Sequence, residues 1–515
     1  MNPGRNFFYL LSFIEGACVM AAELMGAKMM APFYGSSLYV WASVMAITLA
    51  GLASGYFVGG IFSSKNNHKK KLYWCLLLAG VFTIFMPFSA KISFWIFGAL
   101  SLIPAVIITS LVVLFPPVFL MGMVSPLIIR NITSDAEKAG RVSGTVYAVS
   151  TVGGIIATFL FGFYIIPFVG LTVPSVVTGI ALGILPCIML MKEKSFNSAL
   201  FIVVAVWGIF TSFSKPAEST IHVLYHSEGL LGQVYVLEYP NEYYYPGDSL
   251  KKGTYSRWLY VNRVSQTMDD PSANRSKGEE RYFTYVYKIE QASDSLLFSG
   301  RNKALLLGLG GGSVAKHLSQ KGWEVDVCEL DRRIAEVARN FFDLPDEVNI
   351  TIDDARHFIN LNKKKYDMVV FDIFKGEETP SHVLTIESLE KVKTFLNPGA
   401  MVFLNNFGYI EGEKGRGMRS IYRTLNESGF EVKILPTEKD ENQRNLLFIC
   451  SNGYRISENK NFYLPDENIL DDAILLTDEQ PCFEVINAAA SLAWRNMAIR
   501  QMRQDQFERE LPVFN

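Results

Sequence analysis

KALLLGLGGGSVAKHLSQK, residues 303–321, is the stretch of this 515-residue chain that decides the fold of its second half. Lys303 to Leu309 is a short apolar run that predicts a β-strand, and residues 314–321 are compatible with a helix. The strand ends in a glycine-rich turn, GLGGGS (308–313), which contains Gly308, Gly310, Gly311, Gly312 and Ser313. A strand, a glycine-rich turn and a helix place backbone N–H groups and the positive helix end at the carboxyl edge of the strand, where a nucleoside cofactor binds. Ser313 stands where the third glycine of the dinucleotide fingerprint would be, so the turn alone does not specify a dinucleotide.

Acidic residues follow the next three predicted strands where each strand ends. Residues 324–328 precede Glu329 and Asp331, residues 348–352 precede Asp353, Asp354 and Ala355, and residues 366–371 precede Asp372. An acidic residue at this interval after Gly308 is expected to accept both ribose hydroxyls, and Asp354 is spaced to lie beside the adenine amino group. Each carboxylate taken alone could be a helix cap or a solvated loop residue. Together, at one edge of an open α/β sheet, they predict a nucleoside-binding site.

The remaining segments of the second half complete a doubly wound sheet. We expect helices at 387–396 and 417–428, a strand at 400–405, and closing strands at 430–435 and 445–450. A final β-hairpin is typical of methyltransferase-type Rossmann-like domains. Residues 232–239 and 257–264 alternate like paired strands. The predicted units are therefore a β-hairpin region at 215–300, an α/β Rossmann-like domain at 301–486 and a helical tail at 487–515.

Long apolar runs dominate the first half, up to about Phe213, whereas charged residues recur from Lys215 onward. Because a bilayer-spanning helix needs ~20 apolar residues, residues 1–214 predict an α-helical polytopic membrane domain with about seven spans. The candidate spans are 7–30, 38–62, 72–89, 92–129, 142–168, 171–191 and the shorter 199–213. The fourth contains Pro104, Pro116 and Pro117, so it is either one kinked span or two short ones.

Basic residues in short loops mark the cytoplasmic side of a membrane domain. They occur at Arg5, Lys65, Lys69 to Lys71, Arg130, Lys138, Arg141, Lys192 and Lys194. If residues 199–213 cross the bilayer and residues 92–129 cross it once, the second half lies outside. A re-entrant segment at 199–213, or two crossings by 92–129, would place the second half inside. We expect the second half on the cytosolic side, because the nucleosides that such a site binds are made in the cytosol.

Several other classes of site are disfavoured. The formal net charge is −2 and no long basic stripe is present, so no nucleic acid partner is expected. The six cysteines form no CxxC pair, and His222 and His226 have no acidic or thiol partner nearby in the sequence, so no metal site is expected. No cleavable signal peptide is apparent.

Three charged residues, Glu15, Glu23 and Lys28, fall inside the first apolar segment. Ionised groups are costly there unless they are paired. They indicate either a polar cavity or substrate path, or a buried ion pair that fixes helix packing.

Ordered motifs along the chain resemble the polyamine aminopropyltransferases, of which spermidine synthase is the type, and specifically their membrane-fused bacterial relatives. The matching pieces are LYVNRVSQT (259–267), LLLGLGGGSVAKHL (305–318), VCELD (327–331), DDARHFI (353–359), YDMVVFDIF (366–374) and LLTDEQPCFE (475–484). In the first half, PPVFLMGMVSPLIIRN (116–131) and residues 144–171 are similar to the fused family's spans. The resemblance implies an integral protein of the bacterial inner membrane, with a lipid bilayer as partner and possible homo-oligomers.

The resemblance also implies roles for single residues. Gln266 would contact the nucleoside, Glu329 the ribose and Asp354 the adenine amine. Asp372 would assist deprotonation of the attacking amine, and Tyr285 would belong to the substrate site. An ammonium with a pKa near 10 must lose a proton before it attacks the carbon beside the sulfonium, and a nearby carboxylate can take that proton.

Three departures from the family weaken the polyamine site. An acidic residue of soluble spermidine synthases is replaced by Ser313, and their second active-site aspartate corresponds to Lys375. The His-Glu pair expected after Tyr285 is also missing. The site is therefore poorly supplied with negative charge for a dicationic acceptor.

Three functions follow from these features. The first is transfer of an aminopropyl group from decarboxylated S-adenosylmethionine to a small-molecule amine. The second is methylation or other alkylation of a membrane-associated substrate by intact S-adenosylmethionine. The third is a transporter-like protein regulated by a nucleoside.

Overall fold

The computed structural model describes residues 4–500, except for 36–37, 65–66, 98–99, 101, 134–135, 214–220, 230, 244–251, 275–278, 298–301, 375–379, 443, 454–455, 457–458, 460, 464–469, 481, 495 and 498–499. The chain divides into two compact units. The first contains the apolar helices and residues 227–233, and the second contains the rest of the described chain from Ile221 onward. The expected boundaries at 214/215 and 300/301, the tail beyond 500 and Lys375 lie outside the described residues.

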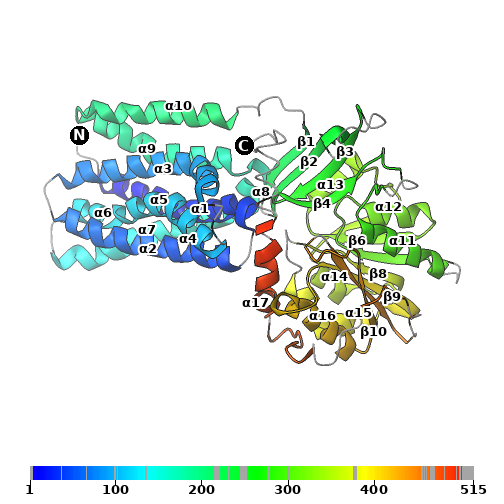
Figure 1. Ribbon diagram of the computed structural model, residues 1–515. Coiled ribbons are helices and arrows are strands. Elements are labelled where there is room, and N and C mark those ends of the chain that lie inside the picture. The colour runs from blue at the N-terminus through cyan, green and yellow to red at the C-terminus, as the bar shows by residue number, and fades with distance from the viewer. Residues whose placement is uncertain are drawn as a thin grey trace. The chain divides into compact units, whose positions relative to one another are not determined.

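Helices form the first unit (Figure 1). They are α1 (Arg5–Tyr34), α2 (Leu38–Ser63), α3 (His68–Phe97), α4 (Leu102–Val113), α5 (Phe115–Gly122), α6 (Val124–Ile132), α7 (Ala136–Leu160), α8 (Ile166–Val169), α9 (Thr172–Lys192) and α10 (Leu200–Ser212). A π-helical turn, η1 (Phe161–Ile165), joins α7 to α8, and a 3₁₀ turn, η2 (Phe196–Ala199), precedes α10. The predicted helical character of the first half is confirmed.

Within the described residues, six stretches are long and apolar enough to cross a membrane: 5–34, 39–63, 68–97, 115–132, 139–169 and 172–192. Residues 103–113 and 196–212 form shorter apolar helices. The segment 92–129, expected as either one kinked span or two short ones, is divided, because α3 continues through Pro87 to Phe97 and the remainder breaks at Leu114 and Met123. Pro116 and Pro117 lie in the first turn of α5, where a proline needs no N–H partner and a new helix can begin.

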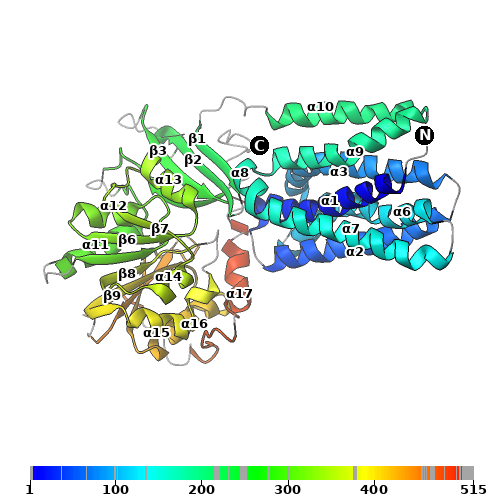
Figure 2. The same cartoon turned by 180° about the vertical axis from the view of Figure 1, so that it is seen from behind.

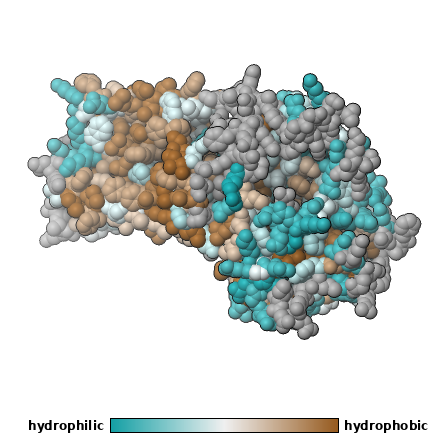
Figure 3. Space-filling view, viewed as in Figure 1, coloured by the Kyte–Doolittle hydropathy of each residue, from teal (hydrophilic) through white to brown (hydrophobic). Residues whose placement is uncertain are grey.

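Large apolar side chains cover the visible surface of the helical unit (Figure 3). Phe57, Phe163 and Phe210 are 72%, 62% and 72% exposed. A soluble unit would bury such side chains, so a surface of this kind is typical of contact with lipid.

A four-stranded sheet precedes the Rossmann-like sheet, with strand order β1-β2-β3-β4. Its strands are β1 (His222–Gly229), β2 (Gly232–Pro240), β3 (Tyr255–Val261) and β4 (Val264–Asp269). β2 pairs antiparallel with β3, as the alternating pattern predicts, and β3 pairs antiparallel with β4. Val264, expected at the end of one strand, begins the next, because Asn262 and Arg263 adopt the positive φ angles of a tight turn.

A seven-stranded mixed sheet forms the centre of the second unit, with strand order β10-β11-β9-β8-β5-β6-β7. The strands are β5 (Lys303–Leu307), β6 (Glu324–Glu329), β7 (Asn349–Ile352), β8 (Tyr366–Phe371), β9 (Leu396–Phe407), β10 (Glu431–Pro436) and β11 (Asn445–Ser451). β5 is parallel to both β6 and β8, and β11 is antiparallel to β9 and β10. The predicted methyltransferase-type order with a closing antiparallel hairpin is confirmed.

Helices cover both faces of this sheet (Figures 1 and 2). One hydrophobic cluster joins the sheet to α11 (Thr284–Leu297), α12 (Ser313–Gln320), α13 (Arg332–Phe341) and side chains of β2 and β3. The other joins it to α14 (Ala355–Leu361), α15 (Ile386–Lys393), α16 (Arg416–Glu427) and α17 (Phe483–Ile486). The helix expected at 387–396 ends at Lys393, because Leu396 already belongs to β9. The small sheet and the Rossmann-like sheet therefore share one core.

Candidate active site

The strand order reverses between β5 and β8, and Gly308 and Asp372 follow these two strands. The backbone N–H of Asp372 donates a hydrogen bond of 2.9 Å to the carbonyl oxygen of Leu307. Gly308 has φ +92°, and a Cβ built there would lie 2.1 Å from the carbonyl oxygen of Asp372. Only glycine allows this approach. Ligands of open α/β sheets bind at such a reversal, so the turn and the proposed base occupy the expected place.

The glycine-rich turn is held against strand β4 of the small sheet. The N–H of Gly311 donates a hydrogen bond of 2.8 Å to Oγ1 of Thr267. A Cβ built at Gly310 would lie 3.0 Å from that same oxygen and 3.9 Å from the carbonyl oxygen of Gln266. Gly312 has φ +79° and caps the amino end of α12, which begins at Ser313. The structure thus brings Gln266 to the turn, and it adds Thr267, which the sequence pattern did not single out.

Glu329, at the end of β6, is tied to the same turn. Its Oε2 accepts a hydrogen bond of 3.0 Å from the N–H of Leu309, and its Oε1 accepts one of 2.8 Å from the N–H of Asp331. Burial raises the pKa of Glu329 to about 7, although these backbone hydrogen bonds oppose the rise. A carboxyl group so placed can lose its proton when ribose hydroxyls replace water around it.

Asp331 has a different local role. It caps α13 by accepting a hydrogen bond from the N–H of Arg333, and its carboxylate pairs with the Arg333 guanidinium at 2.6 Å. Of the two carboxylates predicted for the ribose, Glu329 is the one in contact with the glycine-rich turn.

Asp354 lies one strand further along the carboxyl edge, after β7. Its Oδ1 accepts hydrogen bonds from the N–H groups of Arg356 and His357, so it caps α14, whose first residue is the buried Ala355. Its Oδ2 lies 3.2 Å from Nε2 of His382. Burial would raise the pKa of Asp354, but the hydrogen bonds from His357 and His382 hold it below the ordinary value. His382 therefore occupies the oxygen expected to accept the adenine amine, a contact that the sequence did not predict.

Asp372 accepts two side-chain hydrogen bonds. Tyr285 on α11 donates its hydroxyl to Oδ2 at 2.9 Å, and Asn405 on β9 donates Nδ2 to Oδ1 at 2.9 Å. Burial raises the pKa of Asp372, and the bonds from Asn405 and Tyr285 oppose that rise. Burial and the adjacent Asp372 carboxylate together raise the pKa of Tyr285 well above its ordinary value, so its hydroxyl stays a donor.

The side-chain amide of Asn445 orients that of Asn405. Oδ1 of Asn405 accepts a hydrogen bond of 2.8 Å from Nδ2 of Asn445 on β11. The N–H of Asn445 in turn donates to Oγ1 of Thr437 at 2.9 Å. Because its Oδ1 is already an acceptor, Asn405 must present its NH₂ group to Asp372. This network fixes the direction of the Asp372 carboxylate.

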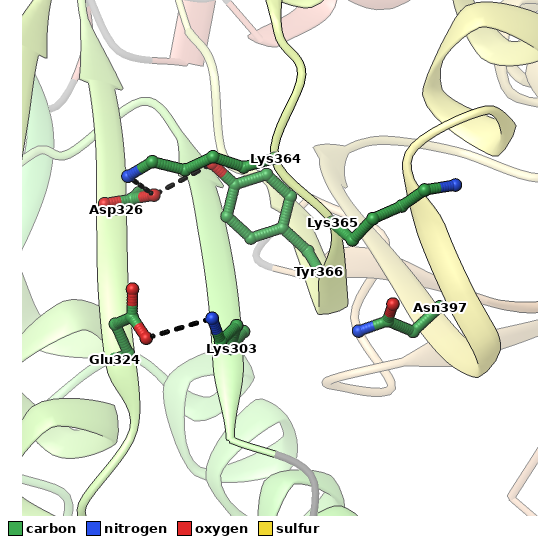
Figure 4. A pocket seen from close by; sticks show the side chains of 7 residues that line it. All are labelled: Lys303, Glu324, Asp326, Lys364, Lys365, Tyr366 and Asn397. Carbon is green, nitrogen blue, oxygen red and sulfur yellow. Dashed lines mark hydrogen bonds and ion pairs between the residues drawn. The ribbon is translucent and has the colours of Figure 1, made fainter.

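A hollow of about 370 Å³ lies at the opposite, amino edge of the sheet (Figure 4). Four of its charged lining residues form two ion pairs: Lys364 contacts Asp326 at 2.7 Å and Lys303 contacts Glu324 at 3.4 Å. Tyr366 also donates its hydroxyl to Asp326 at 2.9 Å. These groups satisfy each other far from the strand ends that carry the glycine-rich turn, so the hollow is a structural polar cluster. Within the described chain, no group of three or more His, Cys, Asp or Glu side chains is arranged to hold a metal ion.

The fold and the site define the protein class as a methyltransferase-type α/β domain with a glycine-rich turn and a hydrogen-bonded carboxylate at the strand-order reversal. Residues 293–434 match the family model of the Spermine/spermidine synthase domain. Residues 293–434 are therefore similar to the spermine/spermidine synthase domain, and the resemblance given by the sequence motifs is confirmed for this part of the chain.

Curated relatives show how far the likeness extends. The chain is 33% identical over 134 residues to the polyamine aminopropyltransferase of Vibrio vulnificus, and the aligned part covers 24% of this chain and 44% of that protein. It is 22% identical to polyamine aminopropyltransferase 2 of Aquifex aeolicus, over 82% of this chain and 83% of that protein. It is 29% identical to the N-terminal histidine N-methyltransferase of Emericella nidulans, over 24% of each chain. The match thus spans less than half of the Vibrio protein and most of the Aquifex protein.

Proposed function

We propose that this protein is a membrane-bound transferase that uses decarboxylated S-adenosylmethionine to aminopropylate an amine. The spermine/spermidine synthase domain and the aminopropyltransferase relatives support the transferase class. The six long apolar helices support membrane attachment.

One observation carries the reaction type: Asp372, whose carboxylate is fixed by Tyr285 and Asn405, follows β8 at the strand-order reversal, and its backbone contacts the glycine-rich turn. A base that is oriented by two donors and lies beside a nucleoside turn is suited to taking a proton from an amine held near the sulfonium. Burial raises the pKa of Asp372 and thereby brings its basicity closer to that of the amine.

The chemistry then needs little beyond positioning. The acceptor ammonium gives a proton to the Asp372 carboxylate, and its freed lone pair forms a bond to the carbon beside the sulfonium sulfur. The bond from that carbon to sulfur breaks, and its electron pair stays on sulfur, so that neutral methylthioadenosine leaves. Because the sulfonium is already an activated leaving group, correct orientation supplies much of the rate.

Ser313 supports a second candidate, alkyl transfer from intact S-adenosylmethionine. Ser313 begins α12, whose amino end favours anions, and it carries no charge to repel a carboxylate. One relative of this part of the chain is named as a histidine N-methyltransferase. The two candidate reactions therefore differ in whether the donor that binds still carries its carboxylate.

The test measures both products in purified full-length protein. Each donor is supplied with a panel of amines, and methylthioadenosine and adenosylhomocysteine are measured together. Methylthioadenosine from the decarboxylated donor supports aminopropyl transfer, whereas adenosylhomocysteine from the intact donor would assign the protein to the second candidate. Calorimetry with both donors gives an independent comparison of affinity.

The variant Asp372→Asn tests the proposed base, and it should reduce turnover by about 100-fold or more. Asp346→Asn, at a fully exposed carboxylate outside the site, is the control and should leave turnover unchanged. Full turnover in Asp372→Asn would remove Asp372 from the mechanism.

We also propose that the Rossmann-like unit faces the cytosol, where its nucleoside is made. Fusions of alkaline phosphatase and of a fluorescent protein after Asn452 test this placement. Fluorescence without phosphatase activity is the expected result, and an active phosphatase would place the unit outside.

A further inference from the structure

Glu15 is a buried carboxyl group that the proposed reaction does not use. It lies on α1 and is 2% exposed. Ser150 of α7 donates its hydroxyl to Oε2 of Glu15 at 3.1 Å. In the described part of the chain, no basic side chain is ion-paired with Glu15, so the ion pair that the sequence left open is not formed there.

The helices cross tightly at this level. A Cβ built at Gly16 would lie 2.0 Å from the carbonyl oxygen of Ser150, and one at Gly153 would lie 2.2 Å from that of Phe13. Close contact of two backbones leaves no space for a methyl group beside Glu15. An organic ammonium or a hydrated metal ion therefore does not fit at this crossing, but a proton does.

The groups around Glu15 are hydroxyls and a thiol. Cys18 lies on the same helix, and its Sγ contacts the carbonyl oxygen of Thr178 on α9 at 3.9 Å. Tyr56 of α2 is near enough to interact electrostatically with Glu15, and it packs edge-on against Tyr147 of α7 at 6.2 Å. From α3, α4, α5, α6 and α9, which also pack on α1, no charged side chain of the described residues contacts Glu15. Nothing in this set neutralises a carboxylate.

We infer that Glu15 is a proton-binding site of the helical unit, with a neutral carboxyl group at rest that releases its proton only when α1 separates from α7. An ionised carboxylate in a bilayer is costly, whereas a protonated one keeps the Ser150 hydrogen bond on its carbonyl oxygen. Release breaks the O–H bond of the carboxyl group, and the proton passes to water admitted by the opened crossing. This inference rests on the proposed membrane insertion but not on the transferase reaction.

Infrared spectroscopy of the full-length protein in phosphatidylglycerol–phosphatidylethanolamine vesicles reads the protonation state directly. The wild type should show the carbonyl stretch of a buried protonated carboxyl group, and Glu15→Gln should lose it. Glu23→Gln is the matched control, because Glu23 lies on the same helix but is only partly buried. If Glu15→Gln instead loses carboxylate bands, Glu15 is ionised and the inference is overturned.

Two further variants test the crossing itself. Ser150→Ala removes the donor without adding volume, and it should move the carbonyl stretch to higher frequency. Gly153→Ala should speed the exchange of the carboxyl proton in D₂O, whereas Gly144→Ala, which meets nothing within 4 Å on the same helix, should not. An unmoved band in Ser150→Ala would contradict the contact even if Gly153→Ala fails to fold. Because the band reports Glu15 itself, these outcomes do not depend on whether an aminopropyl group is transferred.

Discussion

The hydroxyl of Tyr285 donates a hydrogen bond of 2.9 Å to Oδ2 of Asp372, across 87 positions of sequence. This bond stabilises the ionised carboxylate and so lowers the pKa of Asp372 against the larger effect of burial. Tyr285→Phe should therefore raise that pKa further, move the acidic limb of the pH–rate profile to higher pH and slow turnover by about tenfold. The full pH profile of methylthioadenosine release measures the effect. An unshifted limb would mean that Asp372 is not the group that titrates.

Asn405→Leu should also raise the pKa of Asp372, because it removes the donor to the other oxygen of that carboxylate.

Asn445→Ala frees the side-chain amide of Asn405 to rotate while leaving it in place. We expect a loss of about threefold to tenfold in turnover with little change in donor affinity. Equal loss of turnover and of donor affinity in Asn445→Ala would indicate general unfolding instead.

Glu329 should make nucleoside binding depend on pH. Ribose hydroxyls bind the carboxylate form best, and burial raises the pKa of Glu329 to about 7. Below this pH the carboxyl group is protonated, so affinity should fall by up to about tenfold for each further pH unit. Calorimetry in buffers of different ionisation enthalpy should detect proton release on binding. Glu329→Gln should abolish that release, and Glu324→Gln, at the amino end of the same strand, should leave it intact.

Gly308→Ala should destabilise the second unit through a clash as well as through strain. Gly308 and Gly322 have similar φ values, +92° and +89°, but a Cβ at Gly322 meets nothing within 4 Å. The melting temperature of Gly308→Ala should thus lie about 3 °C or more below that of Gly322→Ala. Thermal unfolding of the two purified variants separates the two effects. Identical melting temperatures would mean that the Asp372 backbone can move aside.

Ser313→Asp should restore preference for the decarboxylated donor. A new carboxylate at the start of α12 attracts the aminopropyl ammonium and repels the carboxylate of intact S-adenosylmethionine. Competition between the two donors should shift by about tenfold or more toward the decarboxylated one. A shift in the opposite direction would show that residue 313 does not face the donor's variable group.

The sequence predicted the parts of the site that lie where a strand meets a turn. Gly308, Glu329, Asp354 and Asp372 each follow an apolar run, so their place at the carboxyl edge needs no knowledge of distant contacts. The alternative that the sequence left open, a helix cap, applies to Asp331 and also to Asp354.

Residues fixed by pairing between distant strands could not be predicted in this way. Asn405 lies inside β9, and its contact with Asp372 depends on the register that places Phe371 beside Leu404. Thr267 reaches Gly311 only because the small sheet docks on the glycine-rich turn. Apolar periodicity likewise does not fix the helix breaks at Leu114 and Met123, which immediately precede α5 and α6.

The Asn405–Asn445 hydrogen bond has a consequence for biosynthesis. Asn445 lies on the second strand of the closing hairpin, whereas the glycine-rich turn ends at Ser313. During translation the glycine-rich turn therefore leaves the ribosome more than a hundred residues before the strand that aligns the proposed base. Under the proposed function, the growing chain gains the means to hold its co-substrate first, and catalytic competence comes only with the last strand.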